Sequence, residues 1–216
     1  IAAQPLRPAG SEKYMDGCGI ETSTISMDNY FKTLTNQEFA LADEGKLDLE
    51  SPNRVDSELF NEHMEKLFKC EPVEIPIFDF PSHSRSEKTI SMHRKPNEII
   101  IVEGIHALNP SVTGDSDEYS SRLYVSVRTR IQNKNGETLH PKYVRVLRRM
   151  LRDKIHRARD PRITLEMLSN VERGENQFIM PYKSRANYSI DSFHDYELCT
   201  YKDILMENII QSFCLP

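Results

Sequence analysis

The sequence has few cysteines, no long apolar run and no secretory leader, and each absence removes a class of protein. The four cysteines lie far apart and form no Cys-x-x-Cys pair: Cys18, Cys70, Cys199 and Cys214. This spacing indicates neither a zinc site nor a disulfide framework. No apolar run approaches the roughly 18 to 20 residues of a membrane helix, and residues 1–19 lack the apolar core of a secretory signal. We therefore expect a protein of the reducing cytoplasm with no membrane partner.

The composition is that of an ordinary folded protein. Of 216 residues, 38% are hydrophobic and 28% charged, with a formal net charge of −5. Such a chain is neither disordered, fibrous nor strongly charged as a whole. The length is about one and a half times the commonest domain size, so we expect a single domain over residues 1–216.

Positive charge is concentrated in one segment. Residues 142–159 contain eight Lys or Arg and one acid, a local charge of +7 that leaves −12 for the rest of the chain. At helical spacing, Val144, Leu147, Leu151 and Ile155 share one stripe, and the arginines lie on an adjacent face. Like charges three and four residues apart repel each other, which favours an anionic ligand for this helix over a merely solvated surface.

Strand-like and helix-like segments alternate along the chain. We predict strands at 24–27, 74–78, 99–102, 123–127 and 188–191, helices at 52–68, 142–159, 165–178 and 197–213, and a loop at 133–141. Ser51 and Pro52 have the pattern of an N-cap and a first helical position. The continuous apolar run 99–102 is typical of a strand buried on both faces. This alternation predicts a three-layer α/β fold with a parallel sheet and helices on both faces, which binds ligands at the carboxyl ends of its strands.

Two acids follow predicted strands directly. Asp28 follows 24–27 and Glu103 follows 99–102. A carboxylate in this place can accept a proton from a substrate hydroxyl or bind a magnesium ion, although strand-terminal acids also cap helices. Together with an arginine-rich helix, the two acids indicate phosphoryl transfer, in which positive charge offsets the charge of the transferring group.

Six blocks follow one another in a fixed order. They are ISMDNYF at 25–31, DLESP at 48–52, FDFPSHSR at 78–85, IVEGI at 101–105, RRMLRD at 148–153 and RARD at 157–160. In this order they resemble the uridine kinase family of P-loop kinases, which includes phosphoribulokinase-like relatives. The insertion at 133–141 and the stretch Pro181-Tyr182-Lys183 are similar to the bacterial-type and lower-eukaryotic branch of that family. The resemblance implies a P-loop kinase-like fold with an arginine-rich lid at about 142–162.

The resemblance also implies roles for single residues on the acceptor side. Asp28 matches the acid that serves as general base or positions the nucleoside 5′-hydroxyl. Glu50 matches the acid that binds the ribose hydroxyls, where the family more often has Asp. Phe78 and His83 match the residues beside the pyrimidine base, and Phe78 replaces a common Tyr. Tyr30 and Phe31 are also implied to bind the substrate.

On the phosphate side, the resemblance implies that Glu103 lies near the magnesium ion. Arg149 and Arg159 match arginines near the acceptor nucleoside. Arg152 and Arg157 match lid arginines on the phosphates of ATP. The implied cofactors are therefore ATP and Mg²⁺.

The chain departs from the resemblance at its front. P-loop kinases use Gly-x-x-x-x-Gly-Lys-Ser/Thr, whose backbone N–H groups enclose the phosphates. No such motif occurs here, and the nearest candidate, Arg7-Pro8-Ala9-Gly10-Ser11-Glu12-Lys13, has no Gly-Lys pair. Three explanations remain open: a segment missing near residue 10, a truncated or misassembled gene product, and a degenerate pseudo-kinase.

The expected activity is transfer of the ATP γ-phosphoryl to the 5′-hydroxyl of uridine or cytidine. The alternatives are a kinase of another small hydroxyl acceptor, such as a sugar phosphate or pantothenate, and an inactive pseudo-kinase that acts as a binding or regulatory protein. An RNA-binding module built on 142–159 ranks last, because Tyr143 is the sole aromatic residue there and stacking platforms are missing. We expect a nucleoside and ATP as partners, no nucleic acid, and allow for a homo-oligomer.

Overall fold

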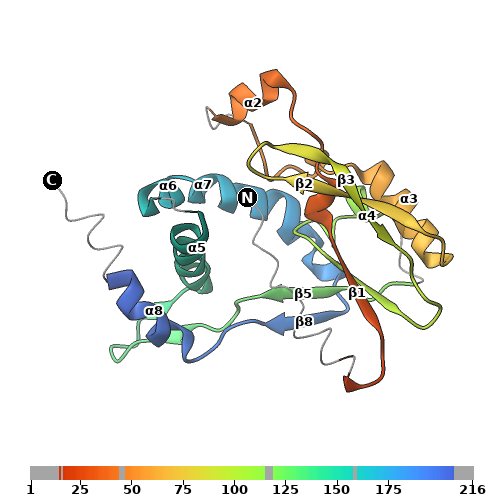
Figure 1. Ribbon diagram of the computed structural model, residues 1–216. Coiled ribbons are helices and arrows are strands. Elements are labelled where there is room, and N and C mark those ends of the chain that lie inside the picture. Colours follow the sequence, from red (N-terminus) through yellow and green to blue (C-terminus); the bar gives the residue numbers. More distant parts are fainter. Residues whose placement is uncertain (1–14, 16, 44–46, 115–118, 158–159, 207–216) are drawn as a thin grey trace. The chain divides into compact units, whose positions relative to one another are not determined.

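The computed structural model describes residue 15 and residues 17–43, 47–114, 119–157 and 160–206 (Figure 1). The chain divides into two compact units. The first comprises Ile1–Ser120 and Gly174–Ser184, and the second Ser121–Arg173 and Arg185–Pro216. The single domain expected from the length stays a prediction. Within the described ranges, every helix is too short or too polar to cross a bilayer.

The first unit contains a parallel pair of strands, β1 (Thr22–Ser26) and β4 (Ile99–Glu103). Thr22 lies opposite Ile99, and Ser26 lies opposite Glu103. Both strands are where their β-branched runs predict them. Burial of β4 on both faces is not found, because Ile99 is exposed and the other residues of the strand are half-buried. In the described part of the chain this sheet has two strands, so β4 lacks a neighbour on one side.

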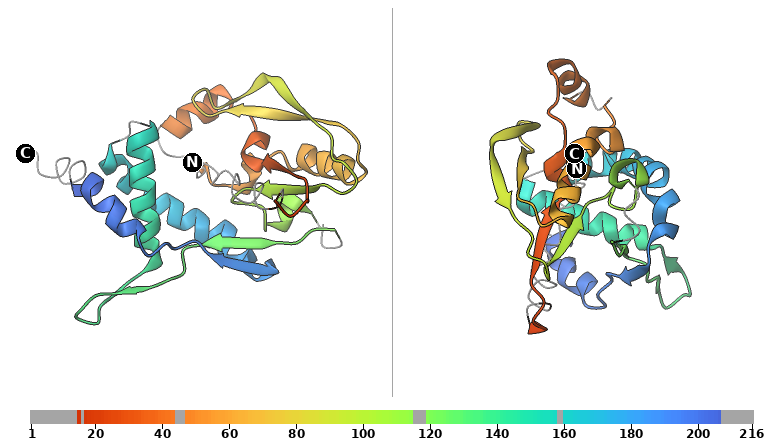
Figure 2. Two further views of the ribbon diagram at one scale, coloured as in Figure 1. Left: turned by 60° about the horizontal axis from the view of Figure 1, so that its bottom comes forward. Right: turned by 90° about the vertical axis from the view of Figure 1, so that its right-hand side faces the viewer.

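An antiparallel hairpin joins β2 (Val73–Asp79) to β3 (Ser84–Met92) and is visible from two further directions in Figure 2. Strand β2 is close to the predicted 74–78, whereas β3 was not predicted. Its residues are mostly polar and exposed, so they lack the apolar alternation that indicates a strand. The register of the hairpin shifts between Pro76 and Phe78. Proline has no backbone N–H to donate to the partner strand, so such an irregularity is typical beside it.

Helix α3 (Ser57–Phe68) begins later than the sequence predicts. Ser51 does act as an N-cap, but of the short 3₁₀ helix Pro52–Arg54, where its side chain accepts a hydrogen bond from the Asn53 backbone N–H. Val55 then pairs with Phe31 in an isolated bridge. Asp56 is the N-cap of α3 and accepts from the Leu59 backbone N–H at 3.2 Å.

The hydrophobic core of the first unit joins β1, α3 and the hairpin. Its buried members are Ile25, Met27, Tyr30, Val55, Phe60, Leu67, Val73, Ile75 and Val112. Two further helices of this unit are α2 (Asn36–Asp43) and α4 (Pro110–Thr113). The core therefore includes Met27 and Tyr30 of the short 3₁₀ helix that follows β1.

The second unit contains the parallel pair β5 (Leu123–Ser126) and β8 (Tyr188–Asp191), both close to their predicted positions. The predicted loop at 133–141 contains a small hairpin of β6 (Ile131–Gln132) and β7 (Thr138–Leu139). Gly136 in its turn has a φ of +85°, a conformation that glycine adopts without strain.

The arginine-rich segment forms helix α5 (Pro141–Arg157). Val144 and Leu151 are buried as its apolar stripe predicts, but Ile155 is 58% exposed. The predicted helix 165–178 is divided into α6 (Pro161–Glu166), α7 (Leu168–Gly174) and a π-helical turn at Glu175–Ile179. Helix α8 (Glu197–Leu205) begins where predicted, and residues 207–213 of that prediction lie outside the described residues.

An ion pair connects α5 to α8. Arg148 donates from Nε and Nη2 to the two carboxylate oxygens of Glu197, at 2.6 and 2.8 Å. Glu197 also accepts from the Tyr201 hydroxyl and the His194 backbone N–H. Burial raises the pKa of Glu197, but these donors outweigh it and hold the pKa below its usual value. This bidentate pair fixes Arg148 within the second unit.

We expect Glu197→Ala to destabilise the protein by about 3 kcal/mol, because it leaves a half-buried guanidinium without its partner. The matched control is Glu172→Ala, which removes the partner of Lys142 from an exposed ion pair at 3.3 Å. The control should cost less than about 1 kcal/mol. Urea unfolding followed by circular dichroism measures both, and equal losses would contradict the assignment.

Candidate active site

The two predicted acids lie at one edge of the β1–β4 pair. Glu103 is the last residue of β4 and pairs with Ser26, the last residue of β1. Asp28 lies two residues after Ser26, in the short 3₁₀ helix Met27–Tyr30. Gly104 follows Glu103, and a Cβ atom at this position would lie 2.6 Å from the Met27 Cβ. A glycine is therefore needed for β4 to pass Met27 and keep the two acids close.

Asp28 is buried, with 7% of its surface exposed. Burial, and to a lesser extent the charges of Glu103 and Glu50, raise its pKa to about 7. At neutral pH the carboxyl is therefore divided between its protonated and ionised forms. A pKa near the working pH is what a general base requires.

Glu103 has the properties of a cation ligand. Burial raises its pKa, while the hydroxyl of Ser26 opposes the rise. Its Oε1 is buried and has no hydrogen-bond partner among the described residues. The described residues contain no group of three or more His, Cys, Asp or Glu able to hold a metal ion by themselves. Glu103 therefore fits Mg²⁺ bound through one carboxylate, with water and substrate oxygens as further ligands.

Three phenylalanines form a cluster beside the acids. The rings of Phe31, Phe78 and Phe80 contact one another edge-on, with centroids 5.3 to 6.5 Å apart. Phe78 is buried, and its backbone N–H donates to Asn29 at 3.3 Å. Phe80 is 44% exposed. Phe80 was not predicted as a site residue, although its spacing of two from Phe78 in FDF indicates that both rings belong to one cluster.

His83 ends the turn between β2 and β3 with a φ of +48°. Its backbone carbonyl accepts from the Leu34 N–H at 3.0 Å, and its ring lies edge-on to Phe39. Burial, and then the charge of Arg54, lower the pKa of His83. The ring is therefore neutral at pH 7 and offers one donor and one acceptor.

Tyr30 does not fit its predicted role. Its side chain is wholly buried, and its hydroxyl lies 3.0 Å from Nδ1 of His63. The ring also packs edge-on against Phe60. These contacts indicate a core residue, so Tyr30 is not part of the site that we propose.

Glu50 lies in the turn before the 3₁₀ helix Pro52–Arg54, and its backbone N–H donates to Asp48 at 3.1 Å. Gly174 packs against it, since a Cβ on Gly174 would lie 2.8 Å from the Glu50 Cβ. No pattern in the sequence indicates this contact, which joins positions far apart in the chain.

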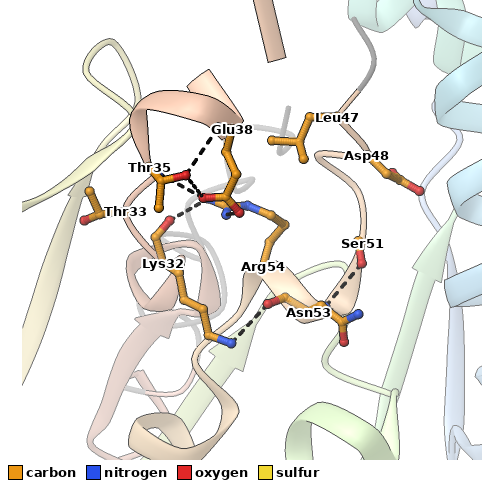
Figure 3. Close-up of a pocket in the computed structure, with 9 residues that line it drawn as sticks. All are labelled: Lys32, Thr33, Thr35, Glu38, Leu47, Asp48, Ser51, Asn53 and Arg54. Carbon is orange, nitrogen blue, oxygen red and sulfur yellow. Dashed lines mark hydrogen bonds and ion pairs between the residues drawn. The ribbon is translucent and has the colours of Figure 1, made fainter. Parts of the chain in front are cut away.

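A pocket of about 530 Å³ adjoins this turn, whose Asp48 and Ser51 contribute to its lining (Figure 3). It is lined by Lys32, Thr33, Thr35, Glu38, Leu47, Asp48, Ser51, Asn53 and Arg54. Arg54 crosses it and is held by the Lys32 carbonyl and by Glu38. The lining includes neither Asp28 nor Glu103, so this pocket does not coincide with the acid pair.

The predicted lid arginines that the structure describes belong to the second unit. Arg152 pairs with the buried Asp153 at 3.5 Å, and Asp153 in turn accepts from the Thr164 hydroxyl at 3.1 Å. Arg149 also lies on α5. The side chain of Arg157 and the whole of Arg159 lie outside the described residues, as does the candidate loop at 7–13.

The arrangement of strands and helices is that of the P-loop kinases. The YGR205w protein matches 80% of this chain over 73% of its own length, with a TM-score of 0.50 and 16% identity. A proposed fructose transport system kinase from Silicibacter sp. TM1040 matches 83% of this chain over 79% of its own, with a TM-score of 0.50 and 14% identity. These likenesses and the parallel strand pairs confirm the predicted α/β fold class.

Sequence relatives identify the family. The model of the phosphoribulokinase / uridine kinase family matches residues 10–128. A uridine kinase from Lactobacillus johnsonii is 32% identical over 164 residues, covering 76% of this chain and 69% of the relative. A uridine kinase from Bacillus pumilus is 33% identical over 168 residues, covering 77% and 70%. The chain belongs to the phosphoribulokinase / uridine kinase family, and it is a kinase of the uridine kinase type.

The raised pKa of Asp28 predicts a pH-dependent cost to folding. The folded chain releases this proton near pH 7, whereas an unfolded chain releases it near pH 3.8. As the pH rises between these values, the carboxyl ionises in the unfolded chain but stays protonated in the folded one, so the free energy of unfolding falls. Asp28→Asn removes that cost, so its gain in unfolding free energy should be larger at pH 8 than at pH 5, by on the order of 2 kcal/mol.

Chemical denaturation at both pH values tests this expectation. Glu62→Gln is the matched control, because Glu62 lies exposed on α3 and its hydrogen bond and ion pair with Lys66 lower its pKa. Its effect should be the same at both pH values. A gain for Asp28→Asn that does not change with pH would contradict the buried, protonated carboxyl.

Proposed function

We propose that this chain is a nucleoside kinase that transfers the γ-phosphoryl of ATP to the 5′-hydroxyl of uridine or cytidine. The observation that carries the proposal is the buried acid Asp28, whose pKa is raised to about 7, beside Glu103 at the ends of two paired parallel strands. Membership of the phosphoribulokinase / uridine kinase family supports the same reaction class.

Asp28 is the proposed general base. A carboxylate with a pKa near 7 is ionised often enough at neutral pH to accept the proton of a primary hydroxyl. Burial keeps water from competing for the same carboxylate. As the proton moves to Asp28, the 5′-oxygen becomes a better nucleophile toward the γ-phosphorus.

The acceptor contacts come from the surrounding loops. We assign Glu50 to the ribose hydroxyls, because it is close enough to Asp28 to affect its pKa. Phe31 and Phe78 supply an apolar wall for the pyrimidine, and Phe80 extends that wall into solvent. The neutral ring of His83 can hydrogen-bond to a polar edge of the base.

Charge on the phosphates is balanced by the remaining predicted residues. Glu103 would hold Mg²⁺, which when bound neutralises the charge on phosphate oxygens. Arg149 and Arg159 are proposed to contact the acceptor side, and Arg152 and Arg157 the phosphates of ATP. Their planar guanidinium groups match phosphate oxygens in pairs, which lysine cannot do.

Phosphoryl transfer requires Asp28. Asp28→Asn should lower the turnover of uridine with Mg·ATP by about 10² to 10⁴, while uridine affinity stays within a fewfold, because the amide keeps the shape but cannot take a proton. Transfer of labelled phosphate and calorimetric titration with uridine measure the two quantities. Glu62→Gln should leave both unchanged, and wild-type turnover in Asp28→Asn would refute the role of Asp28.

A second candidate is a nucleoside-binding protein without phosphoryl transfer. It is favoured by one observation, the absence of Gly-x-x-x-x-Gly-Lys-Ser/Thr from the 216 residues. Without that loop, the donor phosphates lack the backbone N–H groups and the lysine that usually hold them.

Titration with ATP at two salt concentrations separates the candidates. A chain whose intact mass is 25.1 kDa should bind ATP weakly and lose affinity steeply with salt, because exposed arginines are screened over about 8 Å at physiological ionic strength. Tight ATP binding by this chain that does not vary with salt would overturn the view that the missing motif is essential.

A further inference from the structure

A buried histidine lies close to the proposed ribose acid. His106 follows β4 by three residues and is 2% exposed. Neither ring nitrogen has a hydrogen-bond partner of good geometry within the described part of the chain. Buried polar groups are nearly always paired, because an unpaired donor or acceptor costs folding free energy. An apolar side chain would fill the same space without that cost, so a histidine here needs an explanation.

The surroundings of His106 indicate what its polarity serves. Burial lowers the pKa of His106, and the nearby Glu50 and Asp48 raise it by less. The ring is therefore neutral at pH 7, with one N–H donor and one acceptor nitrogen. The backbone carbonyl of Glu50 is near enough to affect its pKa, although not placed for a full hydrogen bond. The ring of Phe178 lies edge-on to that of His106, with the two ring centroids 6.4 Å apart.

The turn that carries Glu50 is also confined by Gly174. A Cβ atom on Gly174 would lie 2.8 Å from the Cβ of Glu50, so the backbone of Gly174 packs directly against the Glu50 side chain. Gly174 and Phe178 belong to the same compact unit as His106 and Glu50. Three separate stretches of this unit therefore meet around one acid, and His106 is the polar side chain buried among them.

We infer that His106 is a positioning residue for Glu50, whose turn it holds so that the carboxylate meets the two ribose hydroxyls of the acceptor. This inference rests on the proposed function, because it takes Glu50 as the ribose-binding acid. The neutral ring has one N–H, which is the donor that the side chain of His106 offers toward the Glu50 carbonyl. His106 then contributes to nucleoside affinity, while its unpaired ring nitrogens lower the folding stability.

A double-mutant cycle on the full chain tests the inference. Uridine and 2′,3′-dideoxyuridine are titrated calorimetrically into wild type, His106→Leu, Glu50→Gln and the double variant. His106→Leu should weaken uridine binding about tenfold and leave dideoxyuridine binding within twofold, because the second ligand lacks the hydroxyls that Glu50 binds. In the Glu50→Gln background, His106→Leu should cause no further loss.

Two further variants separate positioning from packing. His106→Leu should unfold at the same temperature as wild type or higher, since it removes unpaired polar atoms. His106→Gln, which retains a donor and an acceptor, should recover part of the uridine affinity. His93→Leu is the matched control, because His93 is exposed in the same unit, and it should change neither ligand's affinity.

The outcomes distinguish the two proposals. If wild type binds neither nucleoside, the proposed function and this inference both fall. If wild type binds uridine but His106→Leu weakens both ligands equally, or adds its loss to that of Glu50→Gln, the role of His106 is overturned and the proposed function stands. A lower unfolding temperature with unchanged preference for uridine also overturns it, because His106 would then be a packing residue.

Discussion

The parallel pairing of β1 and β4 is the constraint on which the candidate site depends. Parallel strands end at the same edge of a sheet, so the pairing of Ser26 with Glu103 brings Asp28 and Glu103 together even though their charges repel. Gly104 is part of this constraint, because any larger residue would push the strand end away from Met27. Backbone hydrogen bonds and core packing thus hold two acids in a place that electrostatics alone would not choose.

The two candidate site acids differ from the buried acids of the second unit in their partners. In the second unit, Glu197 is matched by Arg148, and Asp153 by Thr164, so these acids connect helices and stabilise them. In the first unit, Asp28 keeps a raised pKa and Glu103 keeps an oxygen without a described partner. Groups that are buried without compensation gather where a ligand can supply what is missing, and perturbed acids of this kind mark functional sites.

Local sequence patterns predicted the strands better than the helix ends or the contacts of the site. Strand β3 (84–92) was missed because its side chains are polar and its place depends on pairing with β2. The start of α3 was misplaced because Ser51 and Asp56 are both good caps, and the bridge that separates them is tertiary. The strand-end acids were found from position alone. Phe80 and His106 were not, because burial and exposure of single side chains follow from packing between distant segments.

The left-handed backbone at His83 limits which residues can replace it, and with them the base contact that we propose for this position. A φ of +48° is tolerated by asparagine, aspartate, histidine and glycine and disfavours β-branched residues. A residue that replaces His83 must therefore first adopt this backbone conformation, whatever its side-chain chemistry. Among the tolerated residues, asparagine alone combines a donor and an acceptor as neutral histidine does. On the proposed role of His83, very few substitutions at this position could change the preferred pyrimidine, and the phenylalanine cluster is left as the main source of variation in specificity.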